Sequence, residues 1–323
     1  STDLYGGTVN LFKNTLRQQG IEVRFADPAD PKNFEKLTDD KTRAYYGESC
    51  PNPYLRVFPI KEVADIGRPK GIPLIIDNTA SPVICKPLAH GAAIVMHSLT
   101  KYIGGHGTSI GGIVVDGGNF DWTKNRKRQP LLNEPDQSYG GAVWIDAVPQ
   151  LTGANIPFVI RLRVVLLRDT GAPLAPFNAW QIIQGLETVG LRMKQHCSNA
   201  EKVVTFLETQ KKVQNVIYPT NHQGEIKERA LKYMKGGYGS LVGMDVGTKE
   251  NGAKFINNLK MLYHVANIGD ARSLAIHPAT TTHSQLNDEE LLAAGVTPGY
   301  VRLSIGIEHP DDIVADIKQA LAA

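Results

Sequence analysis

The chain has 323 residues and a formal net charge of +3, with 42% hydrophobic and 21% charged residues, a composition typical of a globular protein of one or two domains. No apolar run approaches the roughly 20 residues that a membrane helix needs, and the first residues lack the pattern of a signal peptide, so we expect a cytoplasmic protein with no membrane contact. The 3 cysteines are widely separated, which argues against a zinc site or a disulfide framework, and no metal is expected. The basic run Lys124–Arg128 lacks interleaved aromatic residues and is interpreted as a solvated loop rather than a nucleic-acid site.

The first 120 residues alternate between predicted strands and predicted helices. The strands are expected at Ile21–Phe25, Arg43–Glu48, Pro73–Asp77, Ala92–His97 and Gly112–Asp116. Short helices are expected at Leu11–Leu16, Asn33–Leu37, Ile60–Gly67 and Lys86–His90. Three of the strands are continuous apolar runs, which favours a mostly parallel sheet covered by helices on both faces. The predicted fold class is therefore α/β.

The second half begins with a segment, residues 119–170, that is punctuated by prolines and predicted to be irregular. From Pro176 an apolar stripe at spacings of three and four predicts a long helix to about Met193, followed by a second helix through Leu207. We place a domain boundary within this helical pair and predict a large domain, 1–185, and a small α/β domain, 186–323. In the small domain, strands are expected at Val213–Tyr218, Ser240–Val246, Tyr263–Ala266 and Tyr300–Ile305, and helices at Ala253–Leu259 and Pro310–Leu321.

The segment His97–Gly107 carries the strongest chemical signal in the chain. An apolar strand ends in Ser98, Leu99 and Thr100, then Lys101, then glycines, which would deliver a lysine amine to a small-molecule pocket. An amine in a dry pocket loses its charge more readily than a free one, and only the neutral amine attacks an aldehyde to form an imine. The two hydroxyls would suit a phosphate. The alternative is a solvated lysine at a strand end.

Asp77 ends an apolar strand 24 residues before Lys101 (101 − 77). In open parallel sheets ligands bind beyond the carboxyl ends of the strands. An aspartate there can keep a pyridine nitrogen protonated, as pyridoxal 5'-phosphate (PLP) chemistry requires. The alternative is an aspartate that only caps the following turn.

The order of these two motifs, Asp77–Thr79 and then Ser98–Gly107, closely resembles the Cys/Met-metabolism family of PLP-dependent enzymes. The resemblance covers the chain from Tyr5 to Leu321, and the segment Gly104–Gly112 looks like the O-acetylhomoserine sulfhydrylase branch. It implies the aspartate aminotransferase-like fold, fold type I, with the cofactor PLP bound by the large domain.

The resemblance also implies roles for five residues of the large domain. Lys101 would form the imine with PLP and transfer protons, and Asp77 would pair with the pyridine nitrogen. Ser98 and Thr100 would bind the phosphate. Tyr5 matches a tyrosine that stacks on the cofactor ring and assists departure of the γ-substituent.

Four further residues match family positions. Glu48 and Asn52 would lie near the ring hydroxyl, although Cys50–Pro51 is an unusual filling of that motif. Arg302 would bind the substrate α-carboxylate, for which a planar fork of donors is suited; without the family it would be interpreted as a surface arginine on a strand. Ser273 matches a serine near the lysine and is assigned to substrate binding.

The implied activity is a γ-replacement that converts O-acetyl-L-homoserine and sulfide, or a small thiol, to L-homocysteine, or L-methionine, and acetate. Two alternatives remain open: a γ-lyase of the methionine or cystathionine type, and a truncated, catalytically incompetent partner chain. The partners implied are the amino-acid substrate, the sulfide or thiol, and further copies of the chain in a homotetramer built from dimers.

Family members usually carry about a hundred residues ahead of the tyrosine matched by Tyr5, a size in keeping with part of one large domain. That segment contributes to the phosphate site and reaches the neighbouring subunit. We therefore expect this sequence to lack its N-terminal segment.

Overall fold

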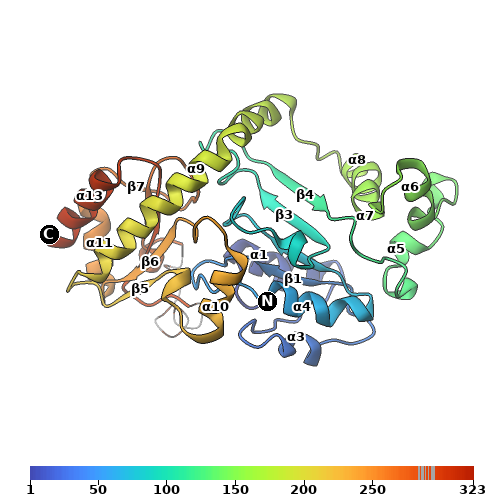
Figure 1. The fold of residues 1–323 in the computed structure, drawn as a ribbon, viewed down its shortest axis with the longest axis horizontal. Coiled ribbons are helices and arrows are strands. Elements are labelled where there is room, and N and C mark those ends of the chain that lie inside the picture. Colours follow the sequence, from blue (N-terminus) through green and yellow to red (C-terminus); the bar gives the residue numbers. More distant parts are fainter. Residues whose placement is uncertain (283, 285–286, 288, 290, 292–294) are drawn as a thin grey trace.

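The computed structural model describes residues 1–282, 284, 287, 289, 291 and 295–323, and contains two sheets that lie side by side (Figure 1). The first has the order β1-β2-β3-β4, formed by β1 (Tyr45–Glu48), β2 (Leu74–Asp77), β3 (Ile94–Ser98) and β4 (Gly112–Asp116). The second has the order β5-β6-β9-β8-β7, formed by β5 (Asn215–Ile217), β6 (Leu241–Asp245), β7 (Tyr263–His264), β8 (Leu274–Ile276) and β9 (Tyr300–Ser304). The predicted α/β class is confirmed.

Strands β1, β2 and β3 run parallel, as predicted, whereas β4 runs antiparallel to β3. A parallel return would need a crossover connection, usually a helix. Residues 99–111 are all described and none of them is helical, so β4 can only fold back beside β3. This geometry keeps the Lys101 segment in a tight turn at the end of β3.

Both faces of β2 are packed, as its apolar run predicts, whereas Ile113 and Val115 of β4 are exposed. Leu74 and Ile76 of β2 belong to one core with α4 (Ile60–Gly67), while Ile75 between them packs with the aromatic core around Trp122 and Trp144. Successive side chains of a strand point to opposite faces, so a continuous apolar run is what such a sheet requires.

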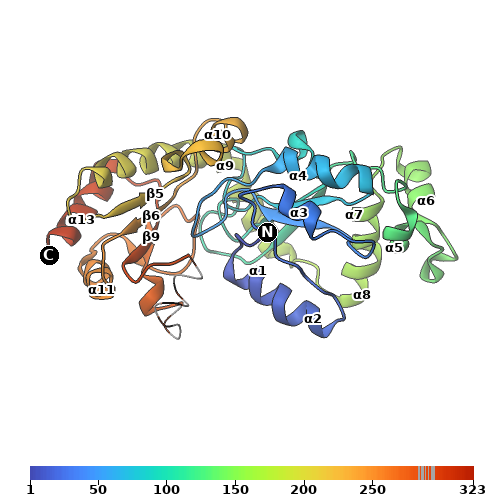
Figure 2. The same cartoon turned by 90° about the horizontal axis from the view of Figure 1, so that it is seen from below.

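The remaining helices surround these sheets. In the N-terminal half the structure contains α1 (Gly6–Asn10), a π-helical turn (Leu11–Thr15), α2 (Leu16–Gln18), α3 (Lys32–Lys36), α5 (Pro130–Asn133), α6 (Trp144–Thr152), α7 (Pro157–Arg161), a second π-helical turn (Leu162–Leu167) and α8 (Arg168–Thr170). In the C-terminal half it contains α9 (Pro176–Glu208), α10 (Gly224–Tyr233), α11 (Lys249–Asn258) and α13 (Pro310–Ala322). Short 3-10 helices lie at Arg68–Lys70, Pro87–His90, Arg126–Arg128, Gln137–Tyr139, Pro219–Asn221 and Pro278–Thr280. Figure 2 shows α1 and α2 projecting away from the sheets, and none of their residues is buried.

Three of the predictions for individual elements are wrong. Ile21–Phe25 is extended but belongs to no strand, because it has no ladder partner among the described residues. Residues 119–170 are largely helical: Pro130 and Pro157 each occupy the first turn of a helix, where the missing N–H is harmless, so these prolines begin helices rather than interrupt them. The two helices predicted after Pro176 are one continuous helix, α9.

The predicted domain boundary at 185/186 falls inside α9, which crosses the molecule diagonally from the first sheet to the second (Figure 1). The two-domain assignment stays a prediction. Within the described ranges no single helix is long and apolar enough to cross a membrane; the segments Trp144–Thr152 and Pro157–Thr170 meet that criterion only as a pair, which is bent by 100°.

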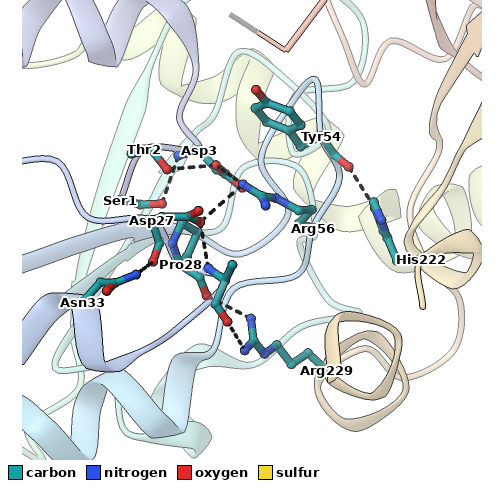
Figure 3. A network of polar contacts seen from close by, with 11 residues as sticks. Ser1, Thr2, Asp3, Asp27, Pro28, Asn33, Tyr54, Arg56, His222 and Arg229 are labelled. Carbon is teal, nitrogen blue, oxygen red and sulfur yellow. Dashed lines mark hydrogen bonds and ion pairs between the residues drawn. The ribbon is translucent and has the colours of Figure 1, made fainter. Parts of the chain in front are cut away.

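A polar network joins the first thirty residues to the rest of the chain (Figure 3). Arg56 donates two hydrogen bonds, of 2.8 and 2.7 Å, to the buried carboxylate of Asp3. Arg229 of α10 donates to the carbonyl oxygens of Pro28 and Ala29 at 3.0 and 2.9 Å. The Arg56 contact fixes the segment that carries Tyr5, whereas the Arg229 contacts fix the loop at residues 28 and 29.

The helix α9 lies so close to the Lys101 turn that position 185 must be glycine. A Cβ built on Gly185 would lie 2.6 Å from the carbonyl oxygen of Ile103 and closer still to that of Gly104, whereas a Cβ on Gly190 would meet nothing within 4 Å. We therefore expect Gly185→Ala to lower the unfolding free energy by about 1–3 kcal/mol, because backbone must shift. Gly190→Ala, the matched control, should raise it by up to about 1 kcal/mol through helix propensity. Denaturant unfolding measures both, and equal effects would contradict the close docking of α9.

Candidate active site

The ends of three neighbouring strands place the candidate residues in a row. Glu48 ends β1, Asp77 ends β2 and Ser98 ends β3, and the register pairs Glu48 with Asp77 and Asp77 with Met96. Because the three strands are parallel, their carboxyl ends meet at one edge of the sheet, where α/β proteins bind ligands. The structure therefore brings these three residues together, as the sequence predicts.

Thr79 links the ends of β2 and β3. Its backbone N–H donates to Asp77 Oδ1 at 2.8 Å, and its Oγ1 accepts from the backbone N–H of Ser98 at 2.7 Å. The turn-capping role of Asp77 is thus present, and a carboxylate with several acceptor sites retains room for a second partner. Thr100 has a similar local role, since its Oγ1 accepts from the backbone N–H of Gly111 at 3.1 Å.

Lys101 is tied to the second sheet through Asn267. The Lys101 Nζ donates a hydrogen bond to Asn267 Oδ1. The backbone carbonyl oxygen of the same Asn267 accepts from Arg302 Nη2 at 3.1 Å, and that of Ala266 accepts from the same Nη2 at 2.9 Å. One residue therefore contacts both the candidate imine lysine and the candidate carboxylate-binding arginine.

Burial and charge act together on the amine of Lys101. Partial burial and, secondly, the nearby charge of Arg302 hold the pKa of Lys101 below the ordinary lysine value of 10.5. Burial also lowers the pKa of Arg302, but a guanidinium starts from so high a value that it stays charged. The amine of Lys101 therefore loses its proton more easily than an ordinary lysine, while the guanidinium of Arg302 stays charged. This combination suits a nucleophile next to a group that binds a carboxylate.

Tyr5 and Glu48 form the other side of the site. The backbone N–H of Tyr5 donates to Glu48 Oε1 at 2.6 Å, and Tyr5 is 59% exposed. Glu48 is only 7% exposed, and burial raises its pKa to about 8, opposed by the Tyr5 hydrogen bond and assisted by the neighbouring Asp77 carboxylate. Tyr5, Glu48 and Asp77 are therefore linked to one another at the ends of β1 and β2.

Two predicted residues are not joined to this group by any contact among the described residues. Asn52 Oδ1 is buried and has no hydrogen-bond partner in the described part of the chain. Ser273 is fully buried; its Oγ donates to Glu308 Oε2 at 2.9 Å and accepts from the backbone N–H of Gly306 at 2.8 Å. The hydroxyl of Ser273 is therefore occupied by local partners, and the roles assigned to Asn52 and Ser273 stay predictions.

Two residues of the site were not predicted from the sequence: Asn267, which contacts Lys101, and Thr79, which links β2 to β3. Asn267 lies 166 residues from Lys101 along the chain, in the loop between β7 and β8. No spacing rule connects positions so far apart, and β8 itself was not among the predicted strands. Thr79 lies two residues after Asp77 in the same motif. This spacing is the feature of the sequence that could have indicated its role.

The buried Glu48 predicts a specific pH dependence of stability. Its folded-state pKa of about 8 lies above the unfolded value of 4.5, so the folded protein binds this proton more tightly. The corresponding stability is present below pH 4.5 and is lost as the pH rises through about 8. We expect Glu48→Gln to remove this loss, so that its melting temperature falls less than that of the wild type between about pH 5 and about pH 9. The exposed Glu187→Gln is the control, and parallel curves for the wild type and Glu48→Gln would contradict the assignment.

Comparisons with known proteins place this site in a family. The family model for Cys/Met metabolism PLP-dependent enzymes matches residues 1–322. The O-acetyl-L-homoserine sulfhydrylase of Leptospira meyeri is 48% identical over 99% of this chain and 74% of its own length. The homocysteine synthase of Schizosaccharomyces pombe is 44% identical over 98% of this chain and 74% of its own length.

A solved structure agrees with these relatives. A Campylobacter jejuni protein, provisionally assigned as an O-acetylhomoserine (thiol)-lyase and carrying a pyridoxyl-lysine 5'-monophosphate, superposes with a TM-score of 0.91. It is 39% identical, and the match covers 100% of this chain and 76% of that one. This chain belongs to the family of Cys/Met metabolism PLP-dependent enzymes.

Proposed function

We propose that this protein is a PLP-dependent γ-replacement enzyme that converts O-acetyl-L-homoserine and sulfide to L-homocysteine and acetate. The names of the relatives from Leptospira meyeri, Schizosaccharomyces pombe and Thermus thermophilus support this activity. The observation that carries the proposal is the contact of Asn267 with both Lys101 and Arg302, because it brings a nucleophilic amine and a carboxylate-binding cation to one site.

PLP is the cofactor of the family, and the residues of this chain fit it. Lys101 offers an amine of lowered pKa, Asp77 ends the strand that pairs with β3, and the buried Asn52 Oδ1 lacks a partner among the described residues. When bound, PLP withdraws electrons from the substrate α-carbon so that bonds to it can break. Lys101 would hold PLP covalently, Asp77 would pair with the ring nitrogen, and Ser98 and Thr100 would lie near the phosphate.

The chain's own groups then account for binding and proton transfer. Arg302 Nε is buried and has no hydrogen-bond partner in the described ranges, so it can donate to the substrate α-carboxylate while Nη2 stays bonded to Ala266 and Asn267. Once the substrate amine has replaced it on the cofactor, the free Lys101 Nζ would take the α-proton, pass it on to the bound cofactor, and then take a proton from the β-carbon; it would return protons to the substrate carbons after the new bond has formed. Acetate leaves the γ-carbon with the bonding electron pair, aided by Tyr5, and sulfide forms the new bond to that carbon.

We propose that the protein acts in the cytoplasm as a homotetramer. The outer side of α9 exposes Phe177, Trp180, Ile183 and Leu186, each at least half exposed, which supports association through further copies of the chain. The three cysteines, Cys50, Cys85 and Cys197, are free and buried, as in proteins of reducing compartments.

The proposal is tested by supplying the PLP-loaded protein with O-acetyl-L-homoserine, with and without sulfide. We expect homocysteine and acetate in equal amounts when sulfide is present, and a loss of at least about 10³-fold in Lys101→Ala, because the nucleophile and proton carrier is removed. Homocysteine and acetate are quantified by chromatography, and 2-oxobutanoate by a ketoacid assay. Formation of 2-oxobutanoate as the main product with sulfide present would indicate a γ-lyase and contradict the proposal.

A further inference from the structure

Three polar residues line one face of α9 and are almost fully buried. Arg192, His196 and Asn199 follow one another at spacings of four and three, so they share a face of the helix. Arg192 is 5% exposed and the other two are inaccessible to solvent. All three donate to backbone carbonyl oxygens outside α9, so each buried polar side chain joins the helix to another segment.

Arg192 holds the turn that immediately follows Lys101. Its Nη1 donates to the carbonyl oxygen of Tyr102 at 2.6 Å, and its Nη2 donates to that of Ile103 at 2.9 Å. Within α9 the same guanidinium is fixed by Gly185, whose carbonyl oxygen accepts from Nη2 at 2.6 Å, and by Thr188, whose Oγ1 accepts from Nε at 3.1 Å. All four donations go to neutral acceptors, so this buried cation is held by a rigid fork of hydrogen bonds.

The other two residues hold the chain just beyond Arg302. His196 Nδ1 donates to the carbonyl oxygen of Ile305 at 2.7 Å, since a carbonyl can only accept, and burial lowers the pKa of His196 to about 4, so the ring is neutral. Asn199 Nδ2 donates to the carbonyl oxygens of Gly306 and Glu308 at 3.0 and 2.8 Å. Ile305 directly follows β9, the strand that carries Arg302.

We propose that this face of α9 is a positioning element in which Arg192 sets the place of Lys101 relative to Arg302. The inference rests on the proposed function, because that function requires the amine and the carboxylate-binding guanidinium to address one substrate. Lys101 lies in the turn after β3 of the first sheet and Arg302 in β9 of the second, and α9, a single helix of 33 residues, is bonded to the backbone near each. A displacement of about 1 Å at a reacting group can reduce the rate about 10²-fold.

The packing leaves little freedom at the Lys101 end of this element. A Cβ on Gly105 would collide with the guanidinium of Arg192, and one on Gly185 would collide with the backbone of Gly104. The turn and the helix therefore cannot approach further, and the hydrogen bonds of Arg192 prevent them from separating. The distance between the Lys101 turn and α9 can therefore neither decrease nor increase, which fixes the position of Lys101.

A purely structural role for Arg192 makes a different prediction, and Arg229 provides the matched comparison. Arg229 is also buried, 7% exposed, and also donates to two successive carbonyl oxygens, those of Pro28 and Ala29, with Glu225 as an additional neighbour at 3.4 Å. Its contacts join α10 to the loop at residues 28 and 29 (Figure 3). Arg192→Lys and Arg229→Lys should both lower the melting temperature, because each loses the second hydrogen bond of a buried fork.

Only Arg192→Lys should change the behaviour of Lys101. We expect its kcat to fall about 10²-fold, while Arg229→Lys stays within about twofold of the wild type. In the cofactor-free protein, the pH midpoint for acetylation of Lys101, followed by peptide mass spectrometry, should move upward in Arg192→Lys and stay unchanged in Arg229→Lys. Thr188→Val removes the acceptor of Arg192 Nε and the hydroxyl's 3.3 Å hydrogen bond to the Gly185 carbonyl oxygen; it should shift the midpoint in the same direction by less, and it serves if Arg192→Lys does not fold.

The labelling measurement needs neither PLP nor substrate, so it reports on the positioning element even if the proposed reaction proves wrong. An unchanged Lys101 midpoint in both Arg192→Lys and Thr188→Val would overturn the inference. Equal losses of kcat in Arg192→Lys and Arg229→Lys would also overturn it, because they would show a general effect of removing a buried arginine.

Discussion

The hydrogen bond from Lys101 Nζ to Asn267 Oδ1 is the interaction on which the site depends. It joins the turn after β3 to the loop between β7 and β8, and the backbone of the same Asn267 holds Arg302. The two sheets would otherwise present an isolated lysine and an isolated arginine. With this link, the amine and the guanidinium both lie within hydrogen-bond distance of one residue, Asn267.

Desolvation then gives these groups their chemical character. The same burial that favours the neutral amine of Lys101 also favours the neutral carboxyl of Glu48, whereas the guanidinium of Arg302 keeps its charge. The sheet edge concentrates Glu48 and Asp77 beside one another, which is unfavourable for folding unless one of them is protonated or paired. Stability is thus reduced locally to maintain groups that can exchange protons, a common property of active sites.

The sequence predicts the parts of this structure that follow from local periodicity. The buried strands around Asp77 and Lys101 were predictable because a sheet covered on both faces requires continuous apolar runs. The strand predicted at Ile21–Phe25 does not form, because an alternating pattern of apolar residues does not by itself provide a neighbouring strand to pair with. The helices of residues 119–170 were missed because a proline in a helix's first turn resembles a helix breaker when only the sequence is read. The contact of Asn267 with Lys101 could not be predicted, because it depends on how two sheets that are far apart in the sequence pack together.

The measurement that tests the central claim most directly is reduction of the PLP-loaded protein with borohydride, followed by digestion and peptide mass spectrometry. If Lys101 is the residue that binds PLP covalently, the pyridoxyl adduct will be found on the peptide that contains Lys101 and will be lost in Lys101→Ala. An adduct on a different lysine of the wild-type protein, or no adduct at all, would contradict this account of the site.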